Sequence, residues 1–281
     1  MTMKNILVHL DNSKACEHRV EAAIALAKRQ GGHVTGAAIA LRSITANYIG
    51  IQIPKRFLED QQQLIDADAQ TAADTFTLST KAAGVESTTE IIYTNAARAA
   101  DRLAYIARSM DITFLGQPNP DEDNRSYMAQ LLEGVLFDSG RPIYLVPYIG
   151  RIEMTHRNAV LAWDGGKKAA RAINDALPLL QGRGKVTLLM VNGKHSSVRK
   201  DHQPGEDMLR HLHSHGIDAQ LENISLQDIK TDAAILNYLS DAGADLLVMG
   251  AYGHSRLRER AFGGVTHNML QCMTTAVLMS D

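Results

Sequence analysis

The sequence is poor in cysteine and in aromatic residues. It has two cysteines in 281 residues, Cys16 and Cys272, which stand far apart and without CxxC spacing. This excludes a disulfide framework and a zinc-finger pattern, and it is typical of a reducing cytosol. Aromatic residues make up 5% of the chain, and no basic stripe with interleaved aromatics is present. The composition therefore argues against nucleic acid as a partner.

A large charge of one sign and long apolar runs are also lacking. The formal net charge is −2, which gives no overall basic field for DNA or an anionic membrane, so an anion must bind locally. No apolar run approaches the roughly 20 residues of a membrane span. The first residues, "MTMKNILVHLD", read as a strand rather than a signal peptide. We therefore expect a cytoplasmic protein with no membrane partner.

Familiar catalytic motifs are missing. The chain has no GxSxG elbow, no HExxH and no Walker A sequence, so we assign no catalytic residue. The composition is that of an ordinary globular protein, with 45% hydrophobic and 21% charged residues. This amount of apolar sequence is enough for two domains with their own cores.

What the sequence does contain is an internal repeat. "NILVHLDNSK" begins at Asn5 and "NAVLAWDGGK" begins at Asn158, and their alignment places Asp11 on Asp164. Further on, "MDITFLG" (110–116) matches "ADLLVMG" (244–250). A repeat this long indicates a tandem duplication of one domain. It predicts a first domain over residues 1–150 and a second over 155–281, with a short linker near 154–157.

Each half alternates short apolar runs with helical patterns. Continuous apolar runs are typical of strands that are buried on both faces of a parallel sheet. Their alternation with helices favours right-handed βαβ units. The predicted fold is α/β, with two tandem, Rossmann-like domains that each have a five-stranded parallel sheet and helices on both faces.

The stretch "VMGAYGHSRLRERAFGGVTHNML" (248–270) runs from a strand through glycines and arginines into a helix. Glycines let the backbone approach a ligand closely, and a helix start attracts an anion. Arginines can close over phosphate with paired hydrogen bonds. The aligned "GQPNPDEDNRSYMAQ" of the first half has prolines and acids instead. Because the first half lacks these glycines, the fold alone does not require them. Their presence therefore favours a ligand in the second half.

The spacing Gly250-x2-Gly253-x9-Gly263 resembles the nucleotide-binding signature of the universal stress protein family, G-x2-G-x9-G-[S/T]. The resemblance implies strand order 3-2-1-4-5, two domains packed as a pseudo-dimer within the chain, and room for a further homodimer. It also implies an adenine nucleotide, ATP or AMP with Mg, and a sensor or adaptor role toward an unknown protein partner. Slow ATP hydrolysis stays open, although no general base is evident.

The family's binding residues carry over to matching positions of this sequence. The resemblance places Asp164 by the ribose or adenine, Val191 in the adenine pocket, and Met249 and Gly250 beside the base and ribose. The phosphate cradle implied by the resemblance and by the basic loop comprises Gly253, Arg256, Gly263, Gly264, Val265 and Thr266. Gly264 departs from the family's Ser or Thr, and the hydroxyl of Thr266 stands two residues on. Asp11, without such a loop, is expected to cap the helix that follows it.

Three alternatives remain. The chain could be an interaction module with a relic pocket, for which Gly264 is the main argument. It could be an enzyme of the wider adenine-nucleotide superfamily, although "AWDGGK" and "HLDNSK" lack the HxGH and SGGxDS motifs. His211 and His215 have the i, i+4 spacing of a zinc pair, but a solvated helix end is favoured, so no metal site is predicted.

Trp163, which precedes Asp164, could pack beside a base, but a tryptophan at such a position is more often a core residue.

Overall fold

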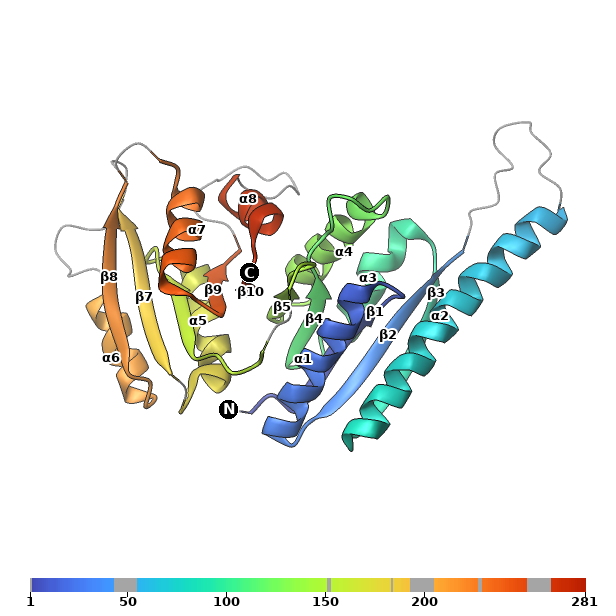
Figure 1. The fold of residues 1–281 in the computed structure, drawn as a ribbon, viewed down its shortest axis with the longest axis horizontal. Coiled ribbons are helices and arrows are strands. Elements are labelled where there is room, and N and C mark those ends of the chain that lie inside the picture. The colour runs from blue at the N-terminus through green and yellow to red at the C-terminus, as the bar shows by residue number, and fades with distance from the viewer. Residues whose placement is uncertain are drawn as a thin grey trace.

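The computed structural model describes residues 2–42, 55–150, 153–182, 184–192, 205–226, 229–251 and 264–281 (Figure 1). The first half of the chain contains β1 (Asn5–Leu10), α1 (Lys14–Gln30), β2 (His33–Leu41), α2 (Lys55–Ala83), β3 (Ser87–Thr94), α3 (Ala96–Ala107), β4 (Ile112–Gly116), α4 (Arg125–Asp138) and β5 (Ile143–Val146). The second half contains β6 (Asn158–Ala162), α5 (Lys167–Leu180), β7 (Lys185–Asn192), α6 (Glu206–Ser214), β8 (Ala219–Ser225), α7 (Thr231–Ala242), β9 (Leu246–Gly250), α8 (Gly264–Cys272) and β10 (Ala276–Ser280).

The strands form one ten-stranded sheet in the order β3-β2-β1-β4-β5-β10-β9-β6-β7-β8. Within each half the neighbouring strands are parallel and follow the predicted order 3-2-1-4-5. The halves meet where β5 pairs with β10 in antiparallel register, with Tyr144 opposite Leu278. The predicted α/β fold with two parallel five-stranded halves is confirmed, and the pseudo-dimer takes the form of a continuous sheet.

The helices cover both faces of this sheet, as the apolar patterns predict. Buried side chains of α1, α2, α5 and α6 pack in one cluster, and those of α3, α4, α7 and α8 pack in another. Each cluster takes alternate residues of the strands, because successive side chains of a strand point to opposite faces. Figure 1 shows the resulting helix–sheet–helix layers in each half. Among the described helices, none is both long and apolar enough to cross a membrane.

Local signals explain where α1 begins and ends. Ser13 is the N-cap residue, and its hydroxyl accepts a hydrogen bond from the N–H of Cys16 at 3.2 Å. Gly31 ends the helix in the left-handed conformation, with φ of 59°, which glycine adopts without a steric penalty. The buried face between these caps is rich in alanine, so α1 lies close against the sheet.

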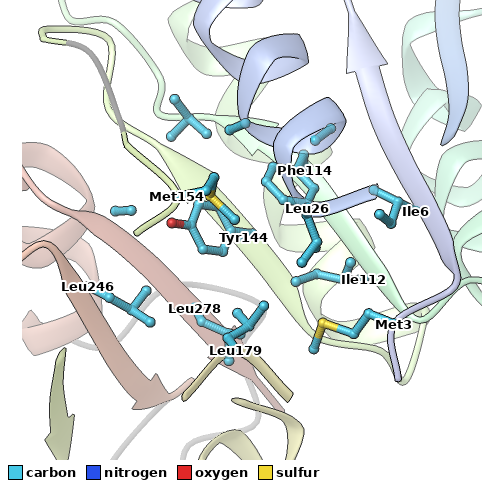
Figure 2. Packing of buried hydrophobic residues seen from close by; sticks show 14 of the residues in the cluster. Met3, Ile6, Leu26, Ile112, Phe114, Tyr144, Met154, Leu179, Leu246 and Leu278 are labelled. Carbon is cyan, nitrogen blue, oxygen red and sulfur yellow. The ribbon is translucent and has the colours of Figure 1, made fainter. Parts of the chain in front are cut away.

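The linker between the halves is packed rather than merely connecting. Met154 and His156 are buried, and the carbonyl of Met154 accepts a hydrogen bond from Arg29 Nη1 at 2.8 Å. Nε2 of His156 lies 3.1 Å from the hydroxyl of Tyr144. Figure 2 shows Met154 and Tyr144 beside Leu246 and Leu278 of the second half. The linker therefore helps to hold the two halves together.

The duplication extends to a hydrogen-bonding detail. Asp111 stands before β4, and its carboxylate accepts the N–H groups of Lys4 and Asn5 at 2.7 and 2.8 Å. Asp245 stands before β9 and accepts the N–H groups of Arg157 and Asn158 at 2.6 and 3.0 Å. In both halves an aspartate thus satisfies the backbone donors at the start of the first strand.

Candidate functional site

Several predicted binding residues lie at the carboxyl ends of adjacent parallel strands in the second half. β6 lies between β9 and β7 in the sheet. Asp164 follows β6 by two residues, Val191 is the penultimate residue of β7, and Met249 and Gly250 end β9. Because parallel strands end on the same edge of a sheet, the fold brings these four residues to one edge, where doubly wound proteins bind ligands.

Gly250 also has a packing role. A Cβ at this position would lie 2.6 Å from the amide nitrogen of Ala169 and 2.6 Å from the carbonyl carbon of Lys168. The first turn of α5 therefore passes too close to β9 for any side chain. This explains the glycine without a ligand, and Gly116 in the first half meets a similar demand from Arg19.

Asp164 lies at an open position. Its side chain is exposed, and Oδ1 accepts the N–H of Gly166 at 2.7 Å. Gly166 is the N-cap of α5 and has no side chain to bond the first N–H groups of that helix. Nearby, the ammonium of Lys168 forms an ion pair with Asp281. In the described part of the chain, no ion pair of Asp164 is recorded.

The predicted phosphate cradle is described in part. Gly253, Arg256 and Gly263 lie outside the described residues. Helix α8 begins at Gly264 and includes Val265, as the sequence predicts for a helix that follows the glycine pair. The side chain of Thr266 is 1% exposed, so its hydroxyl lies within the protein. Behind it, Asn268 donates a hydrogen bond to the buried carboxylate of Asp232 and ties α8 to α7.

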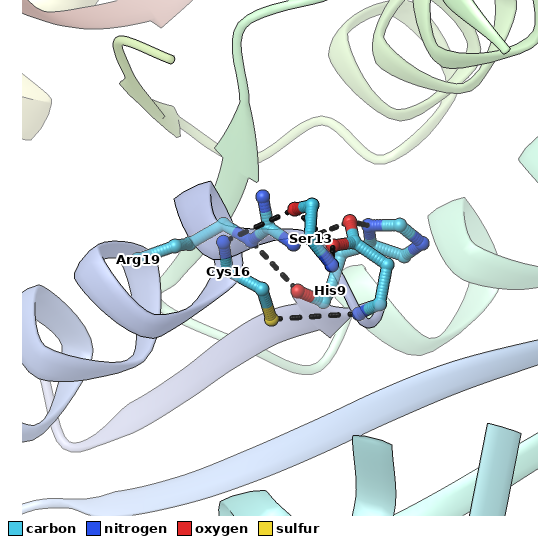
Figure 3. A network of polar contacts seen from close by, with 5 residues as sticks. His9, Ser13, Cys16 and Arg19 are labelled. Atoms are coloured by element: carbon cyan, nitrogen blue, oxygen red, sulfur yellow. Dashed lines mark hydrogen bonds and ion pairs between the residues drawn. The ribbon is translucent and has the colours of Figure 1, made fainter. Parts of the chain in front are cut away.

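In the first half, Asp11 aligns with Asp164, and its carboxylate is bound by the side chain of Arg19. Arg19 is 1% exposed, and its Nη2 donates to Asp11 Oδ2 at 2.7 Å, while its Nε donates to the carbonyl of His9 at 2.7 Å. Figure 3 shows Arg19 with His9, Ser13 and Cys16 in this network. In the repeat alignment, Arg19 corresponds to Ala172 of the second half. The aligned residue Ala172 has no guanidinium, so Asp164 has no counterpart of the Arg19 side chain.

The electrostatics of this network hold it in one charge state. Burial would raise the pKa of Asp11, but the Arg19 guanidinium and the hydrogen bonds from Ser13 outweigh it and hold that pKa well below its usual range. Burial and the charge of Arg19 lower the pKa of His9 to about 4, so His9 is neutral at pH 7. The buried ion pair of Asp11 and Arg19 therefore persists at neutral pH.

The expectation that Asp11 caps α1 is wrong. Ser13 is the cap, and Asp11 instead accepts the N–H of Ser13 at 2.9 Å and a hydrogen bond from its hydroxyl. The sequence patterns do not predict the role of Arg19, although one signal is present. Arg19 stands on the apolar stripe of α1, between Cys16 and Ala23, where a charged residue requires a buried partner.

The remaining candidates are the histidines of α6 and Trp163, which directly follows β6. Nε2 of His211 lies 3.0 Å from Asn174 Oδ1, and Nε2 of His213 lies 3.1 Å from the carbonyl of Ala219. The ring centroids of His211 and His215 are 4.7 Å apart. Among the described residues, no group of three or more His, Cys, Asp or Glu side chains is placed to hold a metal. Trp163 is partly buried and packs against the core.

We expect zinc to leave the melting temperature and the native mass of the protein unchanged. The reason is that a structural zinc site takes four ligands, whereas the described residues offer a pair of histidines. Thermal unfolding and native mass spectrometry with added zinc measure this. A stoichiometric zinc adduct that disappears in the double variant His211→Ala/His215→Ala would contradict it.

The fold defines a class of protein: a doubly wound α/β chain in two halves, a class whose members bind ligands at the carboxyl ends of the strands. Residues 155–280 match the model of the universal stress protein family. The second half of the chain therefore contains a domain of the universal stress protein family, as the sequence predicts. A search of the curated proteins found no match to the chain.

Solved structures support the same fold for the whole chain. A universal stress protein from Archaeoglobus fulgidus DSM 4304 superimposes with a TM-score of 0.68 at 17% sequence identity, over 100% of this chain and 97% of the other. A protein of unknown function from Pseudomonas aeruginosa PAO1 superimposes with a TM-score of 0.57 at 12% identity, over 99% of this chain and 92% of the other. At these identities, the likeness concerns the fold alone.

Proposed function

We propose that the second half binds an adenine nucleotide, ATP or AMP, at the carboxyl edge of β6, β7 and β9. The observation that carries this proposal is the difference between the two halves. Asp164 is exposed at that edge, whereas Asp11 at the matching edge is paired with the buried Arg19. The glycine and arginine loop that would hold phosphates is likewise confined to the second half.

In this proposal each strand end has a role that follows from its chemistry. The carboxylate of Asp164 accepts hydrogen bonds from ribose hydroxyls or the adenine amine, and Val191 and Met249 supply apolar contacts to the base. Gly250 and Gly253 let the backbone come close to the ligand. The phosphates would lie at the start of α8, near Gly263, Gly264, Val265 and Thr266, where N–H groups and the helix dipole favour an anion. Arg256 would add a bidentate contact, and Mg would accompany ATP.

We further propose a cytoplasmic sensor or adaptor rather than a dedicated enzyme. The support is the match of residues 155–280 to the universal stress protein family together with the absence of a recognised catalytic motif in the sequence. A bound nucleotide would alter the surface that a protein partner meets. Nucleotide binding without steady-state turnover is the expected outcome for such a role.

Gly263→Asp is expected to abolish binding of ATP and AMP, because it places a carboxylate among groups arranged for phosphate. Isothermal titration calorimetry on the purified full chain measures the affinity, and mass spectrometry of ligand released from fresh protein identifies the nucleotide. Gln130→Asp is the control, since Gln130 is the exposed residue of the first half that aligns with Gly264, next to Gly263. Unchanged ATP affinity in folded Gly263→Asp would show that the cradle is misassigned.

A further inference from the structure

The first half contains a cavity of about 340 Å³ between α1 and α2, beside the end of β1. Both helices cover the same face of the sheet, where α2 buries mainly small side chains. Val20 and Ile24 of α1 and Ala72 of α2 line this space. Cavities of this size are in the range that holds small organic ligands.

The interior of the cavity is apolar. Its buried lining consists of Leu10, Cys16, Val20, Ile24, Ala72 and Phe76. Such a surface favours the apolar body of a ligand, because burial removes both from water. Phe76 is 1% exposed and packs against Gly36 of β2, so it forms part of the floor of the cavity.

The rim of the cavity is acidic and rich in hydroxyl groups. Asp11, Glu17 and Glu21 line it, together with the hydroxyls of Ser13, Thr75 and Ser79. Among the described residues that line it, none is lysine, arginine or histidine. Arg19 is on α1 as well, but its guanidinium is directed to Asp11 and the carbonyl of His9. Because Arg19 neutralises Asp11, the negative charge of the rim comes from Glu17 and Glu21. A phosphate or carboxylate would meet like charge there, and an ammonium group would meet opposite charge.

We propose that this cavity is a second ligand site, which takes a small molecule with an apolar, preferably aromatic, body and one cationic amine. The body occupies the space between α1 and α2, beside Ala72, and the ammonium group lies at the rim by Glu17. The site is distinct in position and in charge from the nucleotide site proposed for the second half, and it does not depend on that proposal.

The labelling rates of the two cysteines measure whether a ligand occupies the cavity. Cys16 lines the cavity and is 6% exposed, whereas Cys272 is exposed and belongs to α8 in the other half. Burial raises the pKa of the Cys16 thiol, so its alkylation is slow and sensitive to access. Labelling of the full chain with N-ethylmaleimide, followed by peptide mass spectrometry, gives the rate at each cysteine in one experiment. Cys272 serves as the internal control.

Tryptamine is the probe, and indole-3-propionate is its counterpart with the opposite charge. At tryptamine ten times above its dissociation constant, the rate at Cys16 should fall about tenfold while Cys272 is unaffected. Indole-3-propionate should give no protection. If neither compound protects Cys16, the cavity is not a ligand site. If both protect it equally, the cationic class is wrong.

Variants test where the probe binds. Glu17→Gln should weaken the protection by tryptamine about two- to fivefold, as expected for an exposed ion pair, and Glu86→Gln outside the cavity should not. Ala72→Phe should abolish protection by filling the cavity. Because that variant could disturb folding, Thr75→Trp at the exposed rim provides a second block, with Thr71→Trp one turn earlier as its control. Retained protection in folded Thr75→Trp would overturn the assignment.

Discussion

Arg19→Met is expected to lower the free energy of unfolding by about 3–5 kcal/mol, because it leaves the carboxylate of Asp11 half-buried without its cation. The side chain of Arg19 is 1% exposed, so its guanidinium cannot exchange the ion pair for water. The carbonyl of His9 also loses the donor that lies at 2.7 Å. Urea unfolding of the purified variant measures this loss.

Two further variants separate the effect of the ion pair on stability from the effect of losing a long side chain. Arg98→Met removes an exposed arginine from α3 and should change the stability by less than about 0.5 kcal/mol. The double variant Arg19→Met/Asp11→Asn should be more stable than Arg19→Met alone, since it removes the unpaired charge as well. A loss below about 1 kcal/mol in Arg19→Met would mean that the pair contributes little to the fold.

The same pair predicts the effect of acid on stability. The pKa of Asp11 is held below its usual range in the folded protein, so the folded state binds this proton less readily than the unfolded state. The contribution of Asp11 is therefore fully present above the ordinary carboxyl pKa of about 3.9 and is lost as the pH falls toward the lowered value. The stability difference between the native chain and Asp11→Asn should shrink as the pH is lowered below about 4.

The sequence predicts the fold of each half well because the relevant signals are local. Short apolar runs such as "NILVHL" and "DLLVMG" predict strands that are buried on both faces of a sheet. The helical patterns between them predict βαβ units, and so parallel strands. The repeat then transfers each element from one half to the other. Asp164, Val191, Met249 and Gly250 could be placed at one edge for the same reason.

The junction of the halves could not be predicted in the same way. "RPIYLVP" and "TTAVLMS" read as buried strands whichever way they pair, because apolar side chains fit both parallel and antiparallel neighbours. The antiparallel register of β5 and β10, which makes one sheet of two, is decided by the packing of entire halves. Arg19 and the cavity by Ala72 likewise depend on how α1 and α2 lie on the sheet.

Gly250 shows how one residue can satisfy two demands. The resemblance places it beside the base and ribose, and the structure shows that the backbone of Lys168 and Ala169 leaves no room for a Cβ. A glycine at the end of β9 is thus required by packing, whether or not a nucleotide binds. Gly116 is retained in the first half for a comparable reason. Neither glycine separates a binding half from a non-binding half, and Asp164 is the better position to test.

Asp164→Ala is expected to weaken nucleotide binding by about 10- to 100-fold, because a hydrogen bond to a charged group contributes about 1.5–3 kcal/mol. Asp164 is exposed and bonded to the N–H of Gly166, so its removal should leave the fold intact. Calorimetric titration with ATP and AMP gives the affinity and the number of sites. We expect one nucleotide per chain.

Asp11→Ala is the matched change in the first half, and it should leave the affinity nearly unchanged. Asp11 is already paired with Arg19, and the loop after β4 contains Asp121, Glu122 and Asp123, whose charges would repel phosphates. Asp11→Ala should instead lower the stability, because the buried guanidinium of Arg19 loses its partner, so binding is measured at a temperature where the variant is folded. Two sites of comparable affinity, or a greater loss of affinity from Asp11→Ala than from Asp164→Ala, would contradict the assignment of the nucleotide to the second half.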